Sequence, residues 1–174
     1  MLGAAAEVFA ERGYARTKSS DIARRAHVSR STFYEHFENV ADCLLAAYEM
    51  ATDCVSDVVS GACEQGGERT ARLRAAIDEA LDLLASEPAL ANLLGPEAPA
   101  GVQEIAAARQ RLIEHLADLL SRGRRPPGAT AAESPAGTEL RLVEGAFALL
   151  SNRIVADGTK RLPELAPELV ELLE

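Results

Sequence analysis

A short stretch near the N-terminus gathers basic and polar side chains in an order suited to recognising DNA. Arg30 is followed by Ser31 and Thr32, with Tyr34 and His36 behind them at helical spacing. Arginine can read guanine or hold a phosphate, and short hydroxyl side chains can reach base edges or a thymine methyl group. We expect the first three residues to reach bases or phosphate, and Tyr34 and His36 to contact phosphates.

The neighbouring residues predict a helix that presents these side chains. Ser29 is a good N-cap, because its hydroxyl can accept from the free amides that open a helix. Val28 and Phe33 are spaced as a hydrophobic staple, which fixes the angle at which the chain enters the helix. We therefore expect a helix from Arg30 to Phe37 with its two phenylalanines facing a core.

A second short helix is predicted just before the first. Thr17 can cap a helix from Lys18 to Ala26, in which Ile22, Ala23 and Ala26 fall on one face at three- and four-residue spacing. Two short helices joined by a tight turn are typical of a helix-turn-helix, whose second helix enters a major groove. Thr17 and Lys18 are further candidates for phosphate contacts.

The order GY…T…DIA..A.VS..T.Y.HF over residues 13–37, followed by a cap and a long apolar helix, resembles the DNA-binding domain of the TetR family of bacterial transcriptional regulators. The resemblance covers about the first fifty residues. It implies an all-α protein of about nine helices, with a DNA-binding domain at 1–48 and a ligand-binding and dimerisation domain at 49–174. It also implies a homodimer on a palindromic double-stranded operator, more often as a repressor than as an activator.

Three departures from the family pattern affect the expected DNA contacts. His27 stands where members usually carry glycine or another small residue, so a bulky side chain must adopt a backbone conformation that glycine adopts more easily. Val40 occupies the position of a frequent phosphate-contacting lysine. The chain begins almost at its first helix, expected at residues 2–12, without the basic arm that often precedes it.

The charge is distributed unevenly along the chain. The net charge is −9, yet residues 1–48 hold six basic and six acidic residues, and residues 16–36 hold five against two, or +3. The acidic excess therefore belongs to the second domain, and the local basic surface is the part that matters for DNA affinity. With no apolar run near twenty residues and no signal-peptide pattern, we expect a soluble cytoplasmic protein without membrane contact.

Catalytic and metal-binding patterns are weak. Glu114, His115 and Asp118 share a predicted helix and have acid and base side chains, but no nucleophile elbow, phosphate loop or metal spacing accompanies them. A solvated helix face explains them better, so we expect no enzyme, no metal and no cofactor. The three cysteines, Cys43, Cys54 and Cys63, are interpreted as small buried side chains, with a thiol redox sensor as the alternative.

The rest of the chain shows helical apolar spacing. Asn39 caps a long helix of about five turns, which would link the two domains. Further helices are expected over residues 69–86, 88–94, 102–122, 139–156 and 162–173, with a mobile loop at 123–137. Arginines 122, 124 and 125 are interpreted as a solvated helix end rather than as a nucleic-acid contact.

The helices expected over residues 139–156 and 162–173 have wide apolar faces, which suggests that they form a surface for a partner. By resemblance they would pair with their copies in a four-helix dimer interface, with ordinary packing inside one chain as the alternative. The expected interface residues are Leu140, Val143, Phe147, Leu150, Ile154, Leu165 and Leu169.

The resemblance also implies an effector site. Helices from about residue 40 to 156 would enclose an apolar pocket for a small apolar or amphipathic molecule, whose binding favours a state that no longer fits the operator. The sequence does not identify that effector, the operator or the regulated genes. The alternative function is a helical interaction protein whose helix-turn-helix no longer binds DNA specifically.

Overall fold

The computed structural model describes residues 1–95, 103–124 and 136–174, and within these ranges it contains nine α-helices and no strand. Short 3₁₀ helices cover Tyr14–Arg16 and Thr159–Leu165. The expectation of an all-α protein is confirmed. The α-helices are α1 (Leu2–Arg12), α2 (Ser19–Arg25), α3 (Arg30–His36), α4 (Val40–Glu64), α5 (Arg69–Ser86), α6 (Pro88–Leu94), α7 (Gln103–Arg124), α8 (Ala136–Asp157) and α9 (Ala166–Leu173).

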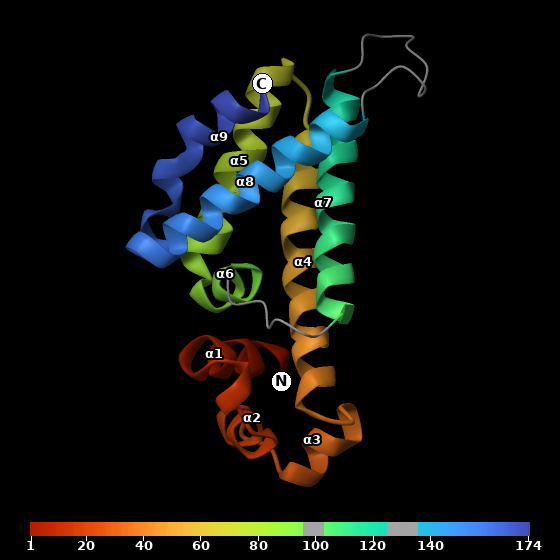
Figure 1. The fold of residues 1–174 in the computed structure, drawn as a ribbon, viewed down its shortest axis with the longest axis vertical. Coiled ribbons are helices and arrows are strands. Elements are labelled where there is room, and N and C mark those ends of the chain that lie inside the picture. Colours follow the sequence, from red (N-terminus) through yellow and green to blue (C-terminus); the bar gives the residue numbers. More distant parts are fainter. Residues whose placement is uncertain (96–102, 125–135) are drawn as a thin grey trace.

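Helices α1, α2 and α3 form a small bundle at one end of the molecule, closed by the first turns of α4 (Figure 1). Its centre is apolar: Phe9, Ile22, Phe33 and Leu44 are each at most 4% exposed. These side chains come from four different helices, so each helix buries one stripe and none is stable alone.

The turn between α2 and α3 has the conformation that was expected from the sequence. His27 has φ of +56°, as expected for a bulky residue in a position that suits glycine. The Val28 amide then donates to the Ala23 carbonyl at 2.9 Å, and Ser29 Oγ accepts from the Thr32 amide at 3.0 Å. Ser29 is therefore confirmed as the cap of α3.

The predicted cap of α2 is wrong by one residue. Thr17 Oγ1 donates to the Gly13 carbonyl at 2.8 Å, which ties it to the end of α1 rather than to α2. Lys18 is the N-cap residue, and its amide donates to Asp21 Oδ2 at 3.2 Å. A carboxylate in the first turn accepts this amide and also favours the positive end of the helix dipole, so Asp21 takes the role expected of Thr17.

Helix α4 is a single element of 25 residues, about 37 Å long. Asn39 Oδ1 accepts from the Asp42 amide and Asp42 Oδ2 from the Glu38 amide, each at 3.0 Å, so the predicted cap is confirmed. The helix packs on α1 near its start and on α5 and α7 further along (Figure 1). It therefore belongs to the core at both ends of the molecule.

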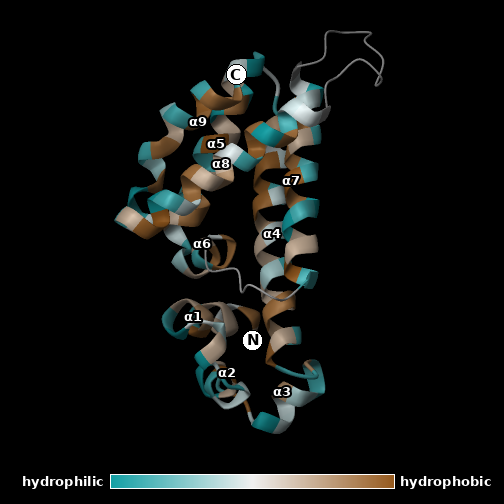
Figure 2. Ribbon diagram, viewed as in Figure 1, coloured by the Kyte–Doolittle hydropathy of each residue, from teal (hydrophilic) through white to brown (hydrophobic). Residues whose placement is uncertain are grey.

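Helices α5 to α9 surround the upper part of α4, and hydrophobic positions concentrate along α4 and α5 (Figure 2). The bounds of α5 and α6 agree with the sequence prediction, and Pro88 opens α6 at a position where its missing amide is harmless. The last predicted helix is divided: residues 159–165 form a 3₁₀ helix containing Pro163, and α9 follows.

The predicted loop at 123–137 falls mostly on residues 125–135, which lie outside the described ranges, as does Arg125. At its edges the prediction is wrong, because α7 runs to Arg124 and α8 begins at Ala136. None of the helices in the described ranges is long and apolar enough to cross a membrane.

We predict that His27→Gly stabilises the protein by about 0.5–1 kcal/mol, because glycine adopts positive φ without a Cβ penalty and only part of this gain is lost to the freer unfolded chain. Thermal unfolding followed by circular dichroism measures the change. His27→Ala is the control, since it removes the exposed ring but keeps the unfavourable backbone. A glycine variant less stable than the alanine variant would contradict this account.

We also predict that Cys43 is inert in the folded protein. Burial, reinforced by the charge of Asp42, raises the pKa of the Cys43 thiol to about 12, so the reactive thiolate is absent at pH 8. A disulfide-forming reagent at pH 8, followed by mass spectrometry, should modify Cys54 and Cys63 first and Cys43 only after unfolding in guanidinium. Equal rates at all three thiols before unfolding would contradict the prediction.

Candidate DNA-binding surface and apolar cavity

Helix α3 presents most of the predicted DNA-contacting side chains to solvent. Arg30, Ser31 and His36 are exposed, and Tyr34 is 50% exposed, which is unusual for so large a side chain. The opposite side of the helix buries Phe33 completely. A short helix anchored by one aromatic residue therefore holds a polar face outward at the end of the molecule.

Tyr34 is fixed in position by its neighbours. Its hydroxyl lies 3.0 Å from Ser19 Oγ on α2, and its ring packs edge-on against Phe33, with centroids 5.2 Å apart. Hydrogen bonding with Ser19 and then with Arg30 lowers the pKa of Tyr34. The contact with Ser19 joins the two helices of the motif, so Tyr34 both braces the motif and presents its hydroxyl near the surface.

The two threonines take different positions. Thr32 is half-buried, and its hydroxyl lies 3.0 Å from the capping Ser29 hydroxyl, at the start of α3. Thr17 is only 8% exposed and donates to Gly13, so its side chain supports the backbone next to exposed Lys18. A phosphate contact near Thr17 would therefore use backbone or Lys18 more readily than the threonine hydroxyl.

Ion pairs neutralise two of the five basic residues of this segment. Arg25 on α2 bonds Glu7 at 2.7 Å and Glu11 at 2.6 Å, which fastens α2 to α1. Arg24 bonds Asp21 at 2.7 Å. Hydrogen bonds to Glu11 and Glu7 raise the pKa of Arg25 further, and the Arg25 hydrogen bond lowers the pKa of Glu11.

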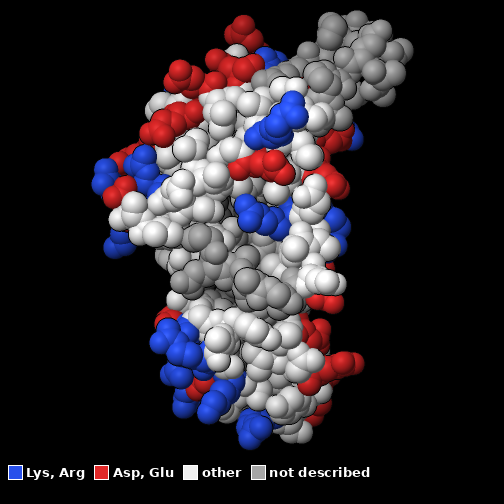
Figure 3. All heavy atoms as spheres, in the orientation of Figure 1, with Lys and Arg blue, Asp and Glu red and all other residues white. Residues whose placement is uncertain are grey.

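The other basic side chains remain available. Within the described ranges, Arg16, Lys18 and Arg30 make no ion pair with a carboxylate. Figure 3 shows basic residues gathered over the end of the molecule that holds α1 and α2, while acidic residues follow α9. The local positive surface predicted from the sequence is therefore present beside α3.

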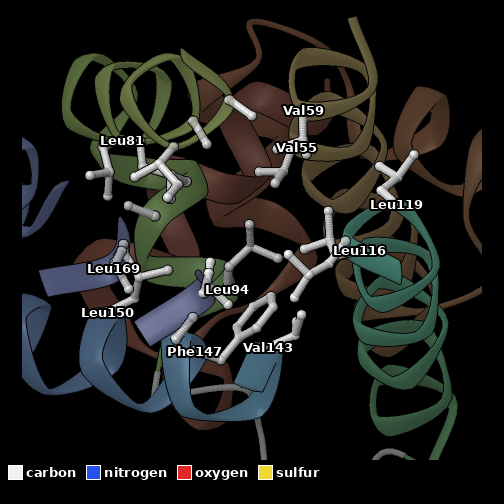
Figure 4. Close-up of a pocket in the computed structure, with 18 of the residues that line it drawn as sticks. Val55, Val59, Leu81, Leu94, Leu116, Leu119, Val143, Phe147, Leu150 and Leu169 are labelled. Atoms are coloured by element: carbon white, nitrogen blue, oxygen red, sulfur yellow. The ribbon is translucent and has the colours of Figure 1, made fainter. Parts of the chain in front are cut away.

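The second feature is an apolar cavity of about 140 Å³ enclosed by α4, α5, α6, α7, α8 and α9. Its walls are almost entirely aliphatic, with Phe147 as the aromatic side chain, and side chains from all sides point into it (Figure 4). Representative lining residues are Val55, Val59, Leu81, Leu116, Phe147 and Leu169. The cavity lies in the expected helices and also includes α9, which the prediction left out.

Several residues expected at a dimer interface face this cavity instead. Val143, Phe147 and Leu169 are at most 6% exposed and line it, and Leu165 is buried at 1%. Leu150 and Ile154 line it while half-buried, and Leu140 is half-buried beside the core. The wide apolar face of α8 is thus used largely inside the chain, because it closes the cavity as well as the core.

Arg109 and Tyr48 are two notable residues that were not predicted from the sequence. Arg109 sits on the apolar stripe of α7, four residues after Ile105 and three before Leu112, and its guanidinium lies over the Phe147 ring. A cation on an otherwise apolar helix stripe could have been noticed in the sequence, because a charge on a buried face needs a partner or access to solvent. Tyr48 gave no such signal, since a tyrosine at a core position is ordinary.

The acid and base residues of α7 make only surface contacts. Glu114 accepts from Gln110, Asp118 pairs with Arg122, and His115 Nε2 lies 3.1 Å from Ser60 Oγ on α4. They do not converge on a common point. No group of three or more histidine, cysteine or acidic side chains in the described ranges is placed to hold a metal.

Comparison with known proteins agrees with this geometry. Residues 1–47 match the family model described as bacterial regulatory proteins, tetR family. An 84-residue part of the chain is 34% identical to the HTH-type transcriptional activator FasR of Mycolicibacterium smegmatis. That match covers 48% of this chain and 38% of FasR, so it spans well under half of that relative's length.

Two solved structures share the fold over 99% of the chain. The fatty acid degradation regulator FadR from Bacillus halodurans superposes with a TM-score of 0.84 at 20% identity, over 91% of its own length. FadR from Bacillus subtilis in complex with stearoyl-CoA gives 0.80 at 22% identity, over 95%. The matched family and these proteins are regulators and not enzymes, in agreement with the prediction. Residues 1–47 are therefore similar to the tetR family of bacterial regulatory proteins, and the chain as a whole shares the helical fold of the two FadR regulators.

Proposed function

We propose that this protein is a dimeric, effector-responsive transcriptional regulator that binds a palindromic operator in the cytoplasm and acts as a repressor. The observation that carries the proposal is the outward polar face of α3, with Arg30 and Lys18 free of carboxylate partners in the described ranges. A two-fold dimer presents two copies of this helix, and such a dimer reads two half-sites about one helical turn apart.

The contacts divide by side-chain chemistry. We assign Arg30 to a guanine edge or an adjacent phosphate and Ser31 to a base edge, since both are exposed at the start of α3. Tyr34, His36 and Lys18 are assigned to phosphates, and Thr32 to a short-range contact beside the cap. Residues 1–48 form the DNA-binding domain and 49–174 the effector and dimerisation domain, with α4 crossing the boundary.

We further propose that the effector carries a long acyl chain. The cavity is lined almost wholly by aliphatic side chains, which suits an alkyl chain better than a polar molecule. The similar fold of Bacillus subtilis FadR, solved with stearoyl-CoA, supports an acyl-CoA thioester in particular. Such a ligand changes DNA binding only if it binds one conformation of the protein more tightly than the other.

The dimer would form through the outer faces of α8 and α9. The outward stripe of α8 carries Ala148 and Asn152, both exposed, and Val155, which is 71% exposed. Half-buried Val170 and Leu172 on α9 extend the apolar surface beside it. Small side chains at the centre of such a stripe let two helices approach closely, as a helical dimer interface requires.

The function is tested by selecting bound sequences from a random double-stranded DNA pool and then titrating the enriched site. Wild type should enrich a palindrome, with affinity that falls steeply as salt rises. Arg30→Gln should weaken binding to it at least about ten-fold, because one good base or phosphate contact contributes about 1–3 kcal/mol.

Arg74→Gln is the matched control for Arg30→Gln, since Arg74 is exposed on α5, far from α3 in the chain. It should leave operator affinity unchanged. A folded wild-type dimer that enriches no sequence even at low salt would refute DNA reading and favour a helical interaction protein. If the protein raises transcription from a reporter that carries the palindrome, it acts as an activator and not as a repressor.

For the dimer, we predict that Ala148→Arg raises the dimer dissociation constant about 30-fold or more, because it places bulk and an unpaired charge at the centre of the proposed interface. Sedimentation velocity over a concentration series measures it. Ala106→Arg, the same change at an exposed position of α7, should have no effect. If both variants remain dimers like wild type, the interface lies elsewhere.

A further inference from the structure

Two buried polar atoms near the apolar cavity, Arg109 Nε and the Tyr48 hydroxyl, make no hydrogen bond within the described ranges. Arg109 Nε is buried and makes no hydrogen bond within the described ranges, although its Cζ lies 5.4 Å from the centroid of the Phe147 ring. Phe147 lines the cavity, so the guanidinium stands at the cavity's edge. The contact with the ring face supports the cation but does not satisfy the buried Nε–H donor.

Tyr48 is the second unpartnered group. It lies on α4, is completely buried, and its hydroxyl has no hydrogen-bond partner in the described part of the chain. Burial raises the pKa of Tyr48, while the nearby charge of Arg109 opposes that rise. The hydroxyl is therefore protonated near pH 7 and remains a hydrogen-bond donor close to the Arg109 cation.

Unsatisfied buried donors are uncommon in folded proteins, because each loses its hydrogen bonds to water without replacement. Here one such donor belongs to Arg109, which contacts Phe147 of the cavity wall, and the other to Tyr48, which lies about two turns before the cavity-lining Val55 on α4 and lines the neighbouring cavity. This arrangement fits a ligand with an alkyl chain and an oxygen acceptor at its end. The donors would bind the acceptor oxygen while the chain fills the cavity.

We propose that Arg109 and Tyr48 hold the head-group oxygen of the acyl effector, either the thioester carbonyl of an acyl-CoA or the carboxylate of a free fatty acid. The proposal rests on the proposed function and assigns the polar part of its effector site. Arg109 supplies charge and donors from α7, and Tyr48 supplies one donor from α4.

The position of Tyr48 also suggests how effector binding is transmitted to the DNA-binding domain. Tyr48 lines a second, smaller cavity of about 110 Å³ together with Phe9 and Tyr14 near α1 and Asn92 on α6. This cavity lies between α1, α4 and α6, and α1 packs directly on α4 and α6. Occupancy at the Tyr48 hydroxyl therefore acts where α4 meets α1.

Two variants test the proposal, both measured for thermal stability without ligand and for binding by calorimetry. The probes are stearoyl-CoA, stearate and CoA alone. Tyr48→Phe removes only the unsatisfied hydroxyl, so it should raise the unfolding temperature by about 1–3 °C while weakening acyl binding about ten-fold. Arg109→Gln should weaken binding by more than ten-fold. A merely structural tyrosine would instead lower the unfolding temperature when its hydroxyl is removed.

Matched controls come from the same region. Tyr14→Phe changes a half-buried tyrosine of the second cavity, and Arg111→Gln changes an exposed arginine of α7 that pairs with Glu49. Both should bind the acyl probes like wild type. Comparison of the three probes shows which head group is bound. Tighter binding of stearoyl-CoA than of stearate supports the thioester, and tighter binding of stearate supports the carboxylate. CoA alone should bind weakly.

Three results would overturn the proposal. If wild type binds stearoyl-CoA and both variants bind it equally well, the donors hold only water. If Arg72→Gln loses binding instead, the head group lies at the opposite end, where Arg69, Arg72 and Arg122 rim a neighbouring cavity of about 260 Å³. If the wild-type protein binds none of the acyl probes, the effector is not an acyl compound. In that case the proposed function fails, and not only the assignment of Arg109 and Tyr48.

Discussion

The burial of one unbroken helix in two different cores is the constraint on which the rest of this structure depends. Leu44 and Tyr48 of α4 are buried near the small helical bundle, and Val55 and Val59 of the same helix line the apolar cavity. A straight α-helix transmits a tilt along its whole length, because its hydrogen bonds resist bending. In the proposed function, effector binding in the cavity reorients α4 against α1, and with it the helix that presents Arg30.

The region around the cavity is less completely packed than the small bundle. A cavity of about 140 Å³ and two buried donors that find no partner among the described residues both lower the stability of the fold. The small bundle shows the opposite pattern: Phe33 is completely buried, Tyr34 is fixed by Ser19, and Arg25 fastens α2 to α1 through two carboxylates. A rigid helix-turn-helix bundle joined to an incompletely packed core is the arrangement expected of a DNA-binding protein that responds to a ligand.

Local signals in the sequence predicted most of the fold. Ser29 and Asn39 cap helices as expected, and periodic apolar residues located α5 and α6 to the residue, because capping and amphipathicity depend on neighbours in the chain. Contacts between distant residues were less predictable. Asp21 and not Thr17 closes the start of α2, and α8 turns Val143 and Phe147 into a cavity rather than toward a partner. Apolar periodicity marks a buried face but does not say whether a core, a cavity or a second subunit covers it.

The central claim is that the operator and an acyl effector bind the same protein with opposed preferences. The most direct measurement is operator affinity by fluorescence anisotropy at increasing stearoyl-CoA, paired with stearoyl-CoA affinity measured with and without the operator. Linkage requires the two factors to be equal, and the account predicts that each ligand weakens the other by the same factor, at least about five-fold. Independent binding of both ligands, with neither affinity changed, would contradict it.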